Sequence, residues 1–141
     1  MKNKEMQKYI NSIELIKSMK LGGKISLAIA KNIKNITIAK EIYENTRRTL
    51  AEQYCIKDGE GKPALVNNMS FQFDNENLKK IDAELAVIGD EDSGVILDLI
   101  DVEPLIEQFS DITPEQVSAL LLLQKPKEKE TTNEPKRRTK K

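Results

Sequence analysis

Residues 25–54 read ISLAIAKNIKNITIAKEIYENTRRTLAEQY, and this stretch decides the fold. Large apolar or aromatic side chains recur in it every seven residues, and we call these four residues the seam: Ile29, Ile36, Tyr43 and Leu50. Because an α-helix turns once every 3.6 residues, side chains seven apart lie on one face. With Ser26 as the capping residue, the pattern predicts one helix over Leu27–Tyr54, about 40 Å long at 1.5 Å per residue.

The seam is longer than a small globular core covers by itself, so something else must lie against it. Three covers are open: the preceding helix folded back, the acidic middle of the chain, or a second copy of the chain. Asn32, Thr46 and Gln53 stand near the edge of the seam, which makes it a poor coiled-coil sequence. We therefore expect the seam to pack into the domain's own core, and a partner or homodimer surface at the seam is the alternative.

The residues before the long helix predict a second helix that folds back on it. Apolar side chains at steps of three and four favour a helix over residues 4–20. Gly22 and Gly23 then end that helix, because glycine has no side chain to restrain the backbone and suits a turn. The result is a predicted helical hairpin.

A small β-hairpin is predicted after the long helix. Two glycines and a proline in residues 57–63 indicate an exposed loop. Residues 64–66 and 69–73 have the composition of two short strands around the turn pair Asn67-Asn68. Alternate side chains of a strand share a face, so three large residues are expected together: Met69, Phe71 and Phe73.

The second half of the chain predicts two helices and one strand. Asp74 or Asn75 caps a helix that Gly89 ends. Its expected buried stripe is Leu78, Ile81, Leu85 and Ile88. Residues 95–102 are rich in β-branched side chains and predict a strand, which we expect beside the second strand of the hairpin. Residues 113–116, Thr-Pro-Glu-Gln, form a capping box that starts a last short helix.

These elements define a mostly helical α+β fold. It consists of a helical hairpin with one long helix, a small β element, a third helix and a short C-terminal helix. A single domain is expected over residues 1–124. Residues 125–141 contain no apolar side chain larger than proline, so we expect them to form a disordered basic tail.

The residues that most enzymes use are scarce. The chain contains no histidine, which excludes the commonest general base and metal ligand, and its single cysteine, Cys55, forms neither an internal disulfide nor a cysteine zinc site. Residues 90–101 superficially match an EF-hand loop, but Val95 stands where that loop needs glycine and Asp101 where it needs glutamate. We expect a protein that is not an enzyme and holds no cofactor and no metal.

Composition also predicts where the protein works. No stretch approaches the roughly 18 uninterrupted apolar residues of a membrane span, and residues 1–11 lack the apolar centre of a secretion signal. A lone cysteine suits a reducing compartment. We therefore expect no membrane association and a cytoplasmic location.

The net charge of zero hides three blocks of alternating sign. Residues 1–57 carry 12 basic and 5 acidic groups, residues 58–124 carry 3 and 15, and residues 125–141 carry 8 and 3. Such segregation favours pairing between the basic and acidic parts, within one chain or between chains. The alternative is that they form separate solvated surfaces.

The basic tail is a candidate for phosphate contacts. Its basic side chains near the end are Lys136, Arg137, Arg138, Lys140 and Lys141. Lysines along the helical hairpin would extend this surface toward a nucleic acid. The neutral total, the few aromatic residues and the absence of a base-reading motif favour instead a solubilising or protein-binding tail.

Three stretches in order carry a family resemblance: residues 21–33, residues 43–61, which end in the loop Lys-Asp-Gly-Glu-Gly, and residues 112–115 before a leucine-rich end. The chain resembles the small proteins of phages and prophages of Gram-positive bacteria known as domain of unknown function 1617. The likeness covers about residues 10–124, although members often have Leu-Pro where this chain has Leu21-Gly22. It implies a phage or prophage genome, in agreement with the many Lys, Asn and Ile residues, and it implies no catalytic residues.

The expected function is non-enzymatic binding of another protein, from the phage or its host. Assembly of the virion and inhibition of a host protein both suit such a factor, in the host cytoplasm or on the virion. The alternative is a nucleic-acid-associated accessory protein that uses the basic tail and the basic helical hairpin. A homodimer formed through the seam is a further expectation.

Overall fold

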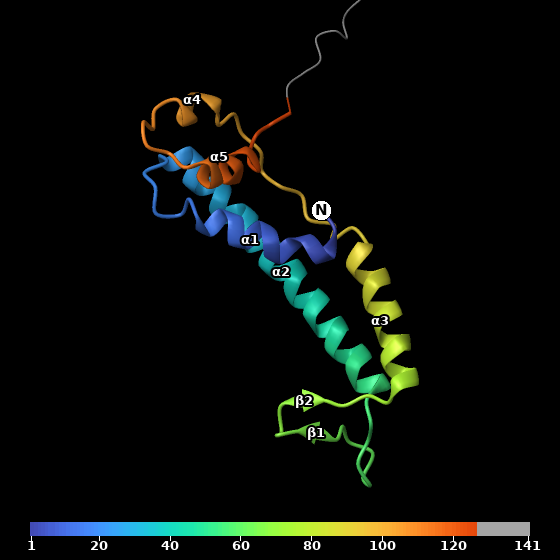
Figure 1. Ribbon diagram of the computed structural model, residues 1–141. Helices are drawn as coiled ribbons and strands as arrows, with labels where there is room; N and C mark the ends of the chain where they lie inside the picture. The colour runs from blue at the N-terminus through green and yellow to red at the C-terminus, as the bar shows by residue number, and fades with distance from the viewer. Residues whose placement is uncertain (127–141) are drawn as a thin grey trace, which may run out of the picture.

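The computed structural model describes residues 1–126, and one long helix joins its two parts (Figure 1). In chain order the elements are the 3-10 turn η1 (Asn3–Glu5), α1 (Met6–Glu14), α2 (Gly23–Tyr54), β1 (Leu65–Val66), β2 (Ser70–Phe71), α3 (Asn75–Asp90), α4 (Glu103–Ile106) and α5 (Pro114–Leu121). The first half of α2 packs with α1, which also contacts α5, and residues of α1, α2, α4 and α5 share one hydrophobic core; we call this part the lobe. The second half of α2 packs with α3 and ends at the hairpin, and we call this part the arm. The predicted mostly helical α+β fold is confirmed.

The long helix ends at the predicted residue but begins earlier. It starts at Gly23 and not at Leu27, and Ser26 lies inside its first turn, where the Ser26 amide donates to the Gly22 carbonyl at 3.0 Å. Gly22 itself caps the helix. Its φ of +84° is a backbone conformation that residues with a side chain rarely adopt. The predicted cap at Ser26 is therefore wrong, because the glycine makes the sharp turn that the connection needs.

The first helix is shorter than predicted. It ends at Glu14 rather than at residue 20. Just after Glu14 the backbone tightens, and the Ile16 amide donates to the Ile13 carbonyl at 3.0 Å. Bonds to the third residue back are typical of a 3-10 turn that closes a helix. The turn keeps Ile16 fully buried, so the apolar stripe continues past the end of the helix.

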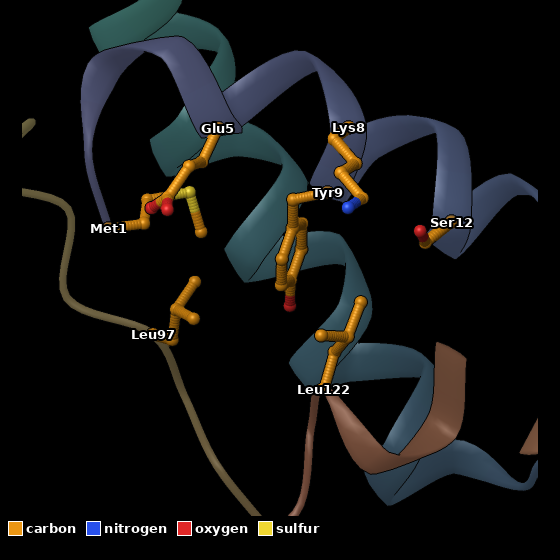
Figure 2. Close-up of a pocket in the computed structure, with 7 residues that line it drawn as sticks. All are labelled: Met1, Glu5, Lys8, Tyr9, Ser12, Leu97 and Leu122. Atoms are coloured by element: carbon orange, nitrogen blue, oxygen red, sulfur yellow. The ribbon is translucent and has the colours of Figure 1, made fainter. Parts of the chain in front are cut away.

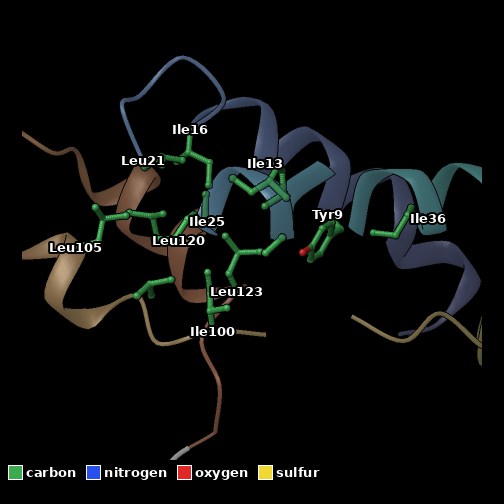
Figure 3. Packing of buried hydrophobic residues seen from close by; sticks show 14 of the residues in the cluster. Tyr9, Ile13, Ile16, Leu21, Ile25, Ile36, Ile100, Leu105, Leu120 and Leu123 are labelled. Atoms are coloured by element: carbon green, nitrogen blue, oxygen red, sulfur yellow. The ribbon is translucent and has the colours of Figure 1, made fainter. Parts of the chain in front are cut away.

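The hydrophobic core lies in the lobe (Figure 3). The large side chains that are less than 2 % exposed include Met6, Ile13, Ile16, Ile36, Val102, Leu120 and Leu123. In the arm, Ile81 and Cys55 are the buried apolar side chains among the residues that the structure describes, and both lie outside this cluster. The arm is therefore a two-helix layer with little interior of its own.

The segment predicted as a strand, residues 95–102, is extended but forms no strand. Its backbone bonds are taken by other groups: the Ile100 amide donates to the Leu123 carbonyl, and Asp98 is bonded by the Asn32 side chain. The hairpin lies at the far end of the arm (Figure 1), so the predicted pairing with it is wrong. The Lys125 amide donates to the Ile100 carbonyl, so the ordered backbone continues one residue past the predicted domain end.

The small hairpin forms as predicted. β1 and β2 pair antiparallel, with Leu65 opposite Phe71. Asn67 and Asn68 both have left-handed backbones, with φ of 53° and 59°, and the Met69 amide donates across the turn. Asparagine tolerates this conformation better than other residues with side chains, which is why the pair makes the turn.

The caps of the last two long helices are confirmed, but Gly89 does not end α3. Asp74 accepts from the Asn77 amide at 2.8 Å, and the Thr113 capping box is complete. Gly89 is buried inside α3, where a Cβ atom would lie 3.2 Å from the Tyr43 hydroxyl. Glycine leaves room there for the Tyr43 hydroxyl, which would have to shift slightly to admit a Cβ atom. The predicted stripe of α3 is also thinner than expected, because Leu78 is exposed.

Candidate protein-binding surface

The four seam residues face the interior of their own chain. Ile29 and Ile36 are buried in the lobe, and Tyr43 and Leu50 are half-buried in the arm. Ile36 has no exposed surface at all. The prediction of a partner or dimer surface at Ile29 and Ile36 is therefore wrong, because the rest of the chain already covers both.

Ion pairs join the basic first part of the chain to its acidic middle. Lys4 Nζ lies 2.6 Å from Asp90 Oδ1, at the junction of the arm and the lobe, and Lys31 lies 3.9 Å from Asp98. The hydrogen bond from Lys4, together with its charge, holds the pKa of Asp90 below the ordinary value of 3.8. The predicted pairing within one chain is thus observed at these two points.

The Lys4–Asp90 pair predicts an acid-sensitive contribution to stability. A lowered carboxyl pKa stabilises the fold above the unfolded value, and this contribution is lost as the pH falls through the folded pKa. We expect wild type to have a higher urea midpoint than Asp90→Asn at pH 7, and the difference to shrink as the pH falls below the ordinary carboxyl value of 3.8 and through the lowered folded-state pKa. The exposed Asp111→Asn is the control and should track wild type at both pH values. A constant difference between wild type and Asp90→Asn would contradict the assignment.

A hollow of about 320 Å³ lies at the end of the arm, between the hairpin and the two helices, and we call it the tip hollow. The residues that line it are Arg47, Ala51, Met69, Ser70, Phe71, Phe73, Leu78, Ile81, Asp82 and Leu85. The three large residues of the hairpin do share one face, as the alternation predicted. The tip hollow therefore combines aromatic, thioether and aliphatic walls with few polar groups, a composition typical of protein contact sites.

Exposed apolar side chains are frequent at the end of the arm, and two of them, Met69 and Leu78, line the tip hollow. Five large ones lie between residues 56 and 78: Ile56, Leu65, Val66, Met69 and Leu78. Met69 is the extreme, at 83 % exposed. Contiguous exposed apolar groups favour association with another surface, and methionine adapts its shape to a partner. Leu65, Val66 and Met69 lie in the segments that the sequence predicts as strands, whereas Leu78 was expected in the buried stripe of the third helix; none of them was predicted as a binding site.

Fixed polar groups surround this apolar surface. Arg47 lies 3.1 Å from Glu44 and 5.7 Å from the centre of the Tyr43 ring, so two contacts hold its guanidinium beside the tip hollow. Tyr54 donates a hydrogen bond to the Glu84 carboxylate, which raises the pKa of the phenol. The Tyr54–Glu84 bond ties α2 to α3, and Arg47 gives the tip hollow a charged edge.

A second hollow, of about 400 Å³, lies over α1 (Figure 2). Tyr9, Ser12 and Lys8 line it, and burial raises the pKa of the Tyr9 phenol. Ser12 has no histidine anywhere in the chain to activate it. Within residues 1–126 no cluster of three potential metal ligands occurs, and no helix there is long and apolar enough to cross a membrane.

The candidate phosphate contacts cannot be placed on this surface. Lys136, Arg137, Arg138, Lys140 and Lys141 lie outside the described residues. On the helical hairpin, Lys17 pairs with Glu14 at 3.4 Å, and Lys31 pairs with Asp98. Acidic neighbours therefore partly neutralise the basic surface that was expected to extend the tail.

Comparisons of the chain with protein-family models, curated proteins and solved structures find no match. No relative therefore lends this chain an activity, a partner or a site. Within residues 1–126, the tip hollow brings large apolar side chains of the hairpin together with Arg47.

Proposed function

We propose that this chain is a non-enzymatic protein-binding factor whose arm carries the binding surface. The observation that supports this most directly is Met69, which stands 83 % exposed beside the tip hollow. A thin two-helix arm that ends in apolar side chains gains stability when another protein covers them, at roughly 25 cal/mol per Å² of apolar area. The lobe carries the core and acts as the base that holds the arm.

The resemblance to phage and prophage proteins of Gram-positive bacteria suggests the kind of partner. We propose a protein of the virion or of the host, bound in the host cytoplasm or on the particle. The factor then serves either in assembly or in inhibition of the host protein. Both roles need a rigid binding surface and neither needs a catalytic group.

Photo-crosslinking from position 69 tests the proposal. We expect a chain with a crosslinking residue at position 69 to form one discrete adduct in extract of an infected Gram-positive host, whereas a residue at position 20, in the lobe, forms none. Leu78→Asp, across the tip hollow, should lower the yield of the adduct at least about tenfold, since a charge in an apolar contact is costly. The matched control Leu15→Asp should leave the yield unchanged. Equal adducts from positions 69 and 20 would overturn the proposal.

A nucleic-acid-associated role is the second candidate, and the exposed lysines of the lobe favour it. Lys20 and Lys24 form no ion pair within residues 1–126. Phosphate contacts weaken steeply with salt. Gel shifts of the full chain and of a chain truncated after Gln124, at two salt concentrations, separate the candidates: salt-sensitive binding that is lost with the tail favours nucleic acid, and no binding at low salt excludes it.

A further inference from the structure

An uncharged stripe runs along α2 and shares no residue with the tip hollow. Its side chains are spaced four, four and three residues apart, so they lie on one side of the helix: Ile38, Ile42, Thr46 and Thr49. Ile38 is 52 % exposed and Ile42 is 64 % exposed. One third of the chain is charged, so an exposed stripe without charge on the longest helix is unusual for a surface that faces only water.

The stripe has relief as well as apolar character. A hollow of about 310 Å³ beside Ile38 is also bordered by Ile96, which is itself strongly exposed. A second hollow of about 230 Å³ lies between Ile42 and α3, where Ile88 lines it. Ile38 and Ile42 thus form a ridge with one hollow beside each residue. Helices pack against each other by fitting such ridges into grooves.

The two threonines of the stripe present methyl groups and no free hydroxyl donor. Thr46 donates to the Ile42 carbonyl at 2.9 Å, and Thr49 donates to the Asn45 carbonyl at 3.0 Å. Because each hydroxyl proton is already used within the helix, burial of these side chains leaves no donor without a partner. The stripe can therefore be covered by an apolar surface at little polar cost.

The charged side chains on α2 beside the stripe indicate which kind of partner could cover it. Lys34, Glu41, Arg48 and Glu52 are exposed, and they form no ion pair within residues 1–126. Lys31, Lys40 and Arg47, on the same helix, are all paired. The unpaired four are arranged as basic, acidic, basic and acidic along the helix, an order that is complementary to its own reverse.

In one register, the α2 helix of an antiparallel second copy would both pair these charges and cover the stripe. When Lys34 faces the partner's Glu52, Glu41 faces the partner's Arg48 to within about one helical turn. The same register sets Ile38 against the partner's Thr49 and Ile42 against the partner's Thr46. A parallel, in-register pair would instead set each of these charges against its own copy, which is repulsive.

We propose that the chain forms a two-fold symmetric homodimer in which two α2 helices pack antiparallel, with the axis level with residues 43–44. This interface buries Ile38 and Ile42 and leaves the tip hollow of each copy open. It is independent of the proposed partner at the tip, because the two surfaces share no residue. In the dimer the arms form a four-helix layer, which supplies the interior that a single arm lacks.

Sedimentation of the full chain from micromolar to millimolar concentration tests the dimer. We expect wild type to dimerise, and Ile42→Asp to raise the dimer Kd at least about 100-fold with an unchanged circular dichroism spectrum, because both copies bury the added charge. Leu15→Asp, an equally polar change at an exposed site in the lobe, should dimerise like wild type. A wild type that stays monomeric at millimolar concentration, or an Ile42→Asp that still dimerises, would overturn the proposal.

A charge exchange tests the register and does not alter the apolar stripe. Lys34→Glu places two acidic groups against each other and should weaken the dimer about tenfold at low salt. The double variant Lys34→Glu/Glu52→Lys restores opposite charges and should recover wild-type affinity to within about threefold. In a parallel, in-register pair Lys34→Glu would only replace one like-charge contact by another, so an unchanged dimer affinity for Lys34→Glu would overturn the antiparallel arrangement.

Discussion

Replacement of Asn32 by leucine is expected to lower the unfolding free energy by about 2–4 kcal/mol. Asn32 is 1 % exposed, and its side chain holds both backbone groups of Asp98: Oδ1 accepts from the Asp98 amide at 2.6 Å, and Nδ2 donates to the Asp98 carbonyl at 3.1 Å. Leucine has a similar shape but no polar atom. The amide and carbonyl of Asp98 would both lose their partners, and each such loss costs about 1–3 kcal/mol when the group is shielded from water.

Urea denaturation followed by circular dichroism measures this loss. Asn11→Leu, on the exposed side of α1, is the matched control and should change stability by no more than about 0.5 kcal/mol. Hydrogen exchange at the Asp98 amide gives a local readout, because that proton should be protected in wild type and lose protection in Asn32→Leu. If Asn32→Leu is as stable as Asn11→Leu, the bonds to Asp98 do not hold the segment to α2.

The same asparagine shows where prediction from the sequence stops. The long helix, the asparagine turn and the Thr113 capping box depend on neighbours a few residues apart, and the sequence predicts all three. Residues 95–102 have the composition of a strand and are extended. Within this segment, however, the backbone of Asp98 bonds not to another strand but to the side chain of Asn32, 66 residues earlier. Asn32 looked like a flaw in a coiled-coil seam, because its role depends on a contact that no local pattern encodes.

The candidate surfaces were predictable only in part, for a similar reason. Alternation placed Met69, Phe71 and Phe73 on one face of the hairpin, but their position at the end of a thin arm comes from the packing of α3 on α2. The seven-residue period selected the side of α2 that the chain covers itself. Ile38 and Ile42, which remain exposed, lie outside that period. An apolar pattern thus identifies helix faces but does not tell which face its own domain covers.

Truncation of Ile36 to alanine is expected to cost about 2–5 kcal/mol, because it leaves a cavity beside a fully buried side chain. Leu27→Ala is the matched control on the same helix. Leu27 is 56 % exposed, so its truncation should cost no more than about 0.5–1 kcal/mol. Both variants are compared with wild type by urea denaturation at low protein concentration. Similar costs for the two would contradict the burial of Ile36.

The dependence of this cost on protein concentration distinguishes a core residue from an interface residue. A side chain that a second copy covers stabilises the fold only when the copies associate, so the cost of truncating it grows with concentration. Ile36 is covered by its own chain, and we expect the cost of Ile36→Ala to be the same at low and high concentration. Truncation of Ile42, in the proposed dimer, should cost more at high concentration. One titration of the two variants therefore assigns the seam to the core and the stripe to the interface, and a concentration-dependent cost at Ile36 would reverse that assignment.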